Sequence, residues 1–176
     1  MSAAHRRYLL LEQGVGAAAF NFVLNAVIAW LMFRGEEEVP LWGQQSIAGD
    51  TIGTSLLLPL LTCLIVTRIA RGHMRAGRVA PLGWTRASHP ALGWLPRGTL
   101  ARGLVLGLVG LVVLAPLTIL GLIAVEVAGL TVRQFVAFKG AFAAFEAAIV
   151  TPLIALWAIA EATGQEAPAA AVRARS

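Results

Sequence analysis

The sequence predicts an all-α integral membrane protein in which four transmembrane helices form one bundle. Long apolar runs with few charges fill most of the 176 residues, and a helix needs about 20 mostly apolar residues to cross a bilayer. The composition agrees, because 58% of the residues are hydrophobic and 13% are charged. In a typical soluble domain roughly 45–50% of the residues are apolar and about 25% are charged. The runs lack the alternating polarity of barrel strands, so we expect helices.

The expected spans follow the apolar runs, and together they make one domain over residues 1–162. They cover residues 8–33, 51–67, 103–125 and 135–160. The first run is longer than the roughly 7–15 apolar residues of a cleaved signal peptide, so we interpret it as a retained span. The alanine-rich segment 163–176 is expected to be a disordered tail.

Basic residues predict how the spans are oriented. The loop 68–102 contains Arg68, Arg71, Arg75, Arg78, Arg86, Arg97 and Arg102. The loop 34–50 has one arginine against four acidic residues. Because basic loops stay in the cytoplasm, both termini and the loop 68–102 are expected on the cytoplasmic side.

The loop 68–102 is predicted to lie on the inner membrane surface. Its arginines would contact anionic lipid headgroups, and this location favours lipid over nucleic acid as the partner of a chain with net charge +5. An alternative is that this loop docks a cytoplasmic or membrane partner. Lys139 is the only lysine beside many arginines, a bias that suggests a bacterial genome and the bacterial inner membrane.

No catalytic motif stands out in the sequence. Cys63 is the only cysteine, and the three histidines lie outside the apolar runs, so neither a disulfide nor a metal site is expected. No nucleophile with a base, zinc-protease motif or phosphate loop appears. The sequence therefore predicts no cofactor and gives no support for an enzyme.

Two glycines in the third span predict close helix packing. Gly103 and Gly107 are four residues apart, so they share one helix face and allow another helix to approach. Such a face could also hold two copies of the chain together as a homo-oligomer.

Polar residues inside the spans are the candidate site. Glu146 lies in the middle of the fourth span, where a carboxylate costs about 2.5–3.5 kcal/mol or more, and such residues usually face a bundle interior or a watery cavity. Lys139 lies on the same face, about 10 Å away at about 1.5 Å per residue. Lys139 is near the outer boundary, where its side chain could reach the headgroups.

Asn21 and Asn25 share a face of the first span, and Asn21 lies at a depth similar to that of Glu146, so the two side chains are expected to be able to meet. Glu12 is expected on the opposite face of this span. Ser55 belongs to a hydroxyl-bearing face of the second span. A second interpretation gives these groups only structural roles, because amides can bond between helices and hydroxyls to their own helix.

Two functions remain open at this point. The first is a small permease-like or channel-like protein, in which Glu146, Asn21, Asn25, Lys139 and Ser55 contact a solute or ion. The second is a structural or accessory subunit of a membrane complex that transports nothing. Water access to Glu146 would distinguish them, because a transport site must be wet from at least one side.

Overall fold

The computed structural model describes residues 1–82, 84 and 96–161. The described elements, in chain order, are α1 (Ala3–Arg7), η1 (Tyr8–Val15), α2 (Gly16–Phe33), β1 (Glu38–Pro40), α3 (Ile47–Arg75), α4 (Thr99–Val109), η3 (Gly110–Leu114), α5 (Ala115–Ala124), β2 (Gly129–Thr131) and α6 (Val132–Glu161). The segments η1 and η3 are π-helical turns within longer helices. The predicted tail 163–176 and residues 83 and 85–95 of the basic loop lie outside the described residues.

Within residues 1–82 and 96–161, four helical rods are long and apolar enough to cross a membrane. They run from Ala3 to Phe33, Ile47 to Arg75, Thr99 to Ala124 and Val132 to Ala160. Large apolar side chains are exposed on the outside of every rod; Val23, Ile52, Val112 and Phe145 are each more than 40% exposed. A soluble bundle would present polar residues there, so this surface is suited to apolar surroundings.

The second rod extends well beyond the expected span 51–67 at both ends. Ser46 begins α3, where its hydroxyl accepts a hydrogen bond from the backbone N–H of Gly49 at 3.1 Å. The helix then continues to Arg75, because arginines are good helix formers once outside an apolar layer. Gly77, with φ of +70°, turns the chain away after the last turn, a conformation that glycine adopts without strain.

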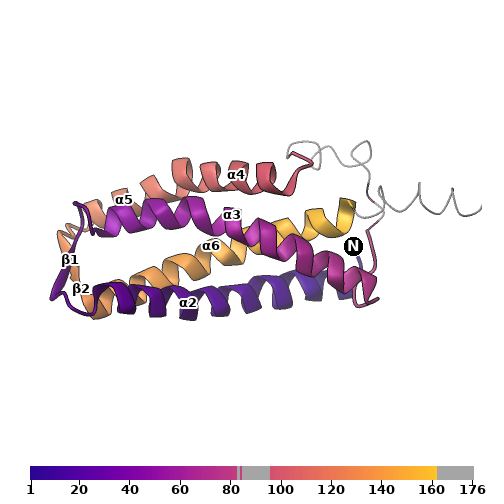
Figure 1. Cartoon of the computed structure of the whole chain (residues 1–176), viewed down its shortest axis with the longest axis horizontal. Coiled ribbons are helices and arrows are strands. Elements are labelled where there is room, and N and C mark those ends of the chain that lie inside the picture. The colour runs from indigo at the N-terminus through magenta and orange to yellow at the C-terminus, as the bar shows by residue number, and fades with distance from the viewer. Residues whose placement is uncertain (83, 85–95, 162–176) are drawn as a thin grey trace, which may run out of the picture.

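The helices form a row in which α3 and α6 are central (Figure 1). α2 packs against α6, α4 packs against α3, and α3 also packs against α6. Each outer helix therefore packs on a helix from the other half of the chain. At one end the row is closed by β1 and β2, an antiparallel pair in which Val39 lies opposite Leu130.

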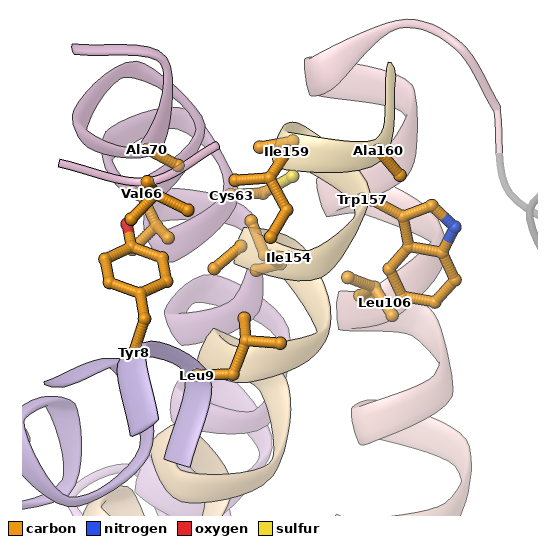
Figure 2. Packing of buried hydrophobic residues seen from close by; sticks show 13 residues of the cluster. Tyr8, Leu9, Cys63, Val66, Ala70, Leu106, Ile154, Trp157, Ile159 and Ala160 are labelled. Carbon is orange, nitrogen blue, oxygen red and sulfur yellow. The ribbon is translucent and has the colours of Figure 1, made fainter. Parts of the chain in front are cut away.

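Two apolar clusters hold the ends of the row together. Near the N-terminus, η1, α3, α4 and α6 contribute Tyr8, Cys63, Leu106 and Trp157, among others (Figure 2). Near the strands, the rings of Phe33 and Phe135 meet edge to face, with centroids 4.9 Å apart. The middle of the row has a smaller cluster around Leu58, and polar groups lie beside it.

Candidate functional site

A long groove runs between α2 and α3, with α6 as its floor. Its volume is about 840 Å³, within the range of roughly 300–1,000 Å³ typical of ligand pockets. Its walls are mostly apolar and include Leu24 and Ile28 from α2 and Leu61 and Ile65 from α3. The polar residues of the lining come from η1, α2, α3 and α6. They are Glu12, Gln13, Asn21, Asn25, Asp50, Thr54, Thr62, Lys139 and Thr151.

A buried ion pair closes the strand end of the groove. The ammonium of Lys139 on α6 donates to the Oδ1 atom of Asp50 on α3, and their side chains are 7% and 14% exposed. Asp50 lies in the first turn of α3, where the helix dipole favours a negative charge. Lys139 is thus held inside the bundle rather than reaching outward, because its partner is available on the neighbouring helix.

The two asparagines line the groove but bond within their own helix. The Nδ2 atom of Asn21 donates to the carbonyl oxygen of Ala17 at 2.9 Å, and that of Asn25 donates to the carbonyl oxygen of Asn21 at 3.0 Å. Each amide also has a carbonyl oxygen and a second N–H group that can bond a ligand. The groove therefore offers both donors and acceptors between apolar walls.

Glu12 lines the same groove as Asn21, which corrects the expectation that the two residues lie on opposite faces. That expectation assumed a regular α-helix from Glu12 to Asn21. Residues 8–15 instead form the π-helical segment η1, whose wider turn contains more residues. The change of pitch rotates Glu12 toward the face that carries Asn21.

Glu146 and Ser55 do not line the groove. They lie on the other side of the contact between α3 and α6. Glu146 is 1% exposed and Ser55 is fully buried. Both carboxyl oxygens of Glu146 and the hydroxyl of Ser55 have no hydrogen-bond partner within the described part of the chain. The expected meeting of Glu146 with Asn21 does not occur, because Glu146 faces η3 whereas Asn21 faces the groove.

Gly110 on η3 is the neighbour that defines the surroundings of Glu146. A Cβ atom added to Gly110 would lie 2.5 Å from the carbonyl oxygen of Ser55 and 2.9 Å from the Oε1 atom of Glu146. Only a residue without a side chain allows η3 to approach so closely. The glycines of this span predict close helix packing, but nothing in the sequence indicates that Gly110 adjoins Glu146.

Gly103 and Gly107 face α3. A Cβ atom added to Gly103 would lie 3.1 Å from the Cα atom of Leu60, and one added to Gly107 would lie 2.5 Å from the carbonyl oxygen of Leu56. The missing side chains let the two backbones approach. These glycines therefore set the distance at which α4 packs on α3.

A polar cluster that sequence reasoning missed lies at the N-terminal end of the groove. The Nδ1 atom of His73 is 3.1 Å from the hydroxyl of Tyr8, and its Nε2 atom is 3.3 Å from a guanidinium nitrogen of Arg78. Arg78 also lies 4.0 Å from the carboxylate of Glu12. Because a guanidinium can only donate, Nε2 of His73 accepts, and its Nδ1–H is free to donate to Tyr8. No local signal predicts this cluster, since Tyr8 and His73 are 65 residues apart.

Histidine, cysteine and carboxylate side chains do not gather in groups of three or more within the described ranges, so those residues provide no set of ligands for a transition metal. No family model, curated protein or solved structure matches the chain. The function must therefore be argued from the groove and the buried polar groups alone.

Proposed function

We propose that the protein is a multi-pass protein of the bacterial cytoplasmic membrane, with both termini in the cytoplasm. Four apolar rods with exposed apolar surfaces support insertion. The arginines after α3 and the acidic residues around β1 support the orientation, because positive loops stay inside. The basic segment that joins α3 to α4 then lies against anionic headgroups.

Reporter fusions test this orientation. A fusion after Gly77 should be active only with a cytoplasmic reporter, and a fusion at the exposed Trp42 only with a periplasmic one. Full-length chains that carry the same reporters at the C-terminus give the matched control and should behave like the Gly77 fusion. A cytoplasmic signal at Trp42 would contradict the four-span arrangement.

We further propose that the protein is permease-like or channel-like, and that the groove between α2 and α3 holds its solute. The observation that carries this proposal is the line of polar groups along an otherwise apolar groove. It extends from the ion pair of Asp50 and Lys139 at one end to Glu12 at the other. Such a line would bond a small polar solute at successive depths, where an apolar wall alone would exclude it.

The groove is bounded by α2, α3 and α6, so its remaining side opens between α2 and α3. A solute path through a membrane must be closed off from lipid on every side. We therefore propose that a second copy of the chain covers this side, and that the transporting unit is a homo-oligomer.

Thiol labelling in proteoliposomes tests whether the groove is wet. The background carries Cys63→Ser, which removes the only native thiol and keeps a donor for the carbonyl oxygen of Thr99. Leu24 lines the groove, whereas its neighbour Val23 is exposed elsewhere on α2. A water-soluble thiol reagent should modify Leu24→Cys at least about tenfold faster than Val23→Cys, because ionised thiols form only where water enters.

Equal, slow labelling at both positions would overturn the permease-like proposal. That result would favour the second candidate, an accessory subunit whose groove receives an apolar helix of a membrane partner. The specific observation in its favour is that apolar side chains such as Leu57, Leu61 and Ile65 form most of the groove wall. Helix association in membranes relies on this kind of van der Waals packing.

A further inference from the structure

Among the described residues, the buried carboxyl of Glu146 has no ion pair or hydrogen bond that would stabilise its ionised form. α3 presents Ser55 to it, while the charged Asp50 of α3 is paired with Lys139. Cys63, the one thiol on α3, donates to Thr99. The rod that contains η3 has no titratable or charged side chain over residues 103–125. An unpaired carboxylate in such surroundings is very costly.

The carbonyl oxygen of Ser55 is the acceptor beside this carboxyl. Pro59 follows Ser55 by four residues in α3. Because proline has no N–H group, the carbonyl of Ser55 lacks the helical hydrogen bond that residue 59 would otherwise donate. An oxygen in this position needs another donor, and a buried oxygen without one costs about 1–3 kcal/mol.

The carbonyl oxygen of Ser55 and the carboxyl of Glu146 both lie close to Gly110. The carbonyl oxygen of Ser55 and the Oε1 atom of Glu146 lie 2.5 and 2.9 Å from the position that a Cβ atom on Gly110 would take. Both oxygens accept hydrogen bonds, and neither can donate while the carboxyl is ionised. A protonated carboxyl has one O–H group, which can donate to the carbonyl oxygen of Ser55.

We propose that Glu146 and the carbonyl of Ser55 form a proton-binding site, in which the neutral carboxyl donates to the carbonyl oxygen. The ligand is a proton and not an alkali-metal ion, because the point close to both oxygens is the Cβ position of Gly110, one bond length from its Cα atom and too near it for a bound metal ion. This proposal does not rest on the groove, since Glu146 lies on the other side of the contact between α3 and α6. Loss of the proton would place a negative charge against the Ser55 carbonyl and loosen the contact with η3.

Infrared spectroscopy of the full-length protein in liposomes tests the site. At neutral pH the wild type should show the C=O stretch of a protonated carboxyl, and this band should shift in ²H₂O. Glu146→Gln should lose the band, because an amide cannot carry it, while still donating to Ser55. Glu12→Gln is the control; it removes an exposed carboxyl and should leave the band unchanged.

A second pair of variants tests the Ser55 carbonyl without touching Glu146. Pro59→Ala returns an N–H group to α3, which competes for that carbonyl, so the carboxyl band should move to higher frequency as its hydrogen bond weakens. Pro152→Ala is the control, because it returns an N–H group to α6, where the carbonyl four residues earlier is that of Ala148. It should leave the frequency of the carboxyl band unchanged. Absence of the band in the wild type at neutral pH, its persistence in Glu146→Gln, or its loss on adding sodium ions at constant pH would each overturn the proposal.

Discussion

Replacing Gly107 with leucine should force α4 away from α3 and lower the free energy of unfolding by about 3 kcal/mol or more, at the upper end of the cost of overpacking. The reason is the distance of 2.5 Å between an added Cβ atom and the carbonyl oxygen of Leu56. That oxygen belongs to the backbone of a helix and cannot rotate aside as a side chain would. Denaturation in detergent, followed by circular dichroism, would measure the loss.

Gly121→Leu is the matched control for this substitution. Gly121 lies in α5 of the same rod, and a Cβ atom added there would meet nothing within 4 Å. It should therefore change stability little, or raise it slightly by removing a flexible helical glycine. Equal stability of the two variants would show that the close approach of α4 to α3 does not exist.

Replacing Lys139 with methionine should destabilise the protein by about 3–5 kcal/mol, the cost of breaking a buried ion pair by removing one partner. Methionine keeps most of the volume of the side chain, so the loss would come from the charge. Asp50 would remain as a carboxylate that is only 14% exposed and has no second ion-pair partner in the part of the chain that the structure describes. Chemical denaturation would measure the effect.

The double variant Lys139→Met with Asp50→Leu separates charge from packing. Removing both charges should recover most of the lost stability, because apolar residues often replace a buried pair at little cost. In a double-mutant cycle, the coupling energy should then be favourable and above about 1 kcal/mol. Additive losses would mean that the two side chains do not interact and that no ion pair closes the strand end of the groove.

The four helices could be predicted from the sequence because charge is absent over long runs, and burying a charge in an apolar layer is costly. The residues at which these helices begin and end could not be predicted. The arginines after residue 67 suggested a loop, yet the helix α3 continues to Arg75. Charge marks where an apolar layer ends, whereas capping groups such as Ser46 and turns such as Gly77 decide where a helix ends.

The candidate residues could be listed from the sequence, but their partners could not be predicted. Glu146 was singled out because its burial is costly, which requires no knowledge of its neighbours. Its neighbours depend on which helices adjoin: Gly110 on η3 is near it, and Asn21 is not. The face of Glu12 was wrongly predicted because nothing in the sequence revealed the π-helical turn.

The central place of α6 has a consequence for biosynthesis. Both walls of the groove pack against α6, which is made after the other described helices. Asp50 emerges 89 residues before Lys139, an interval on the order of ten seconds at about 5–20 residues per second. Throughout this interval the carboxylate of Asp50 lacks its lysine partner, and α2 and α3 lack the helix against which they pack. Chains truncated by proteolysis or a premature stop codon before α6 would therefore remain open and be recognised by quality-control proteases.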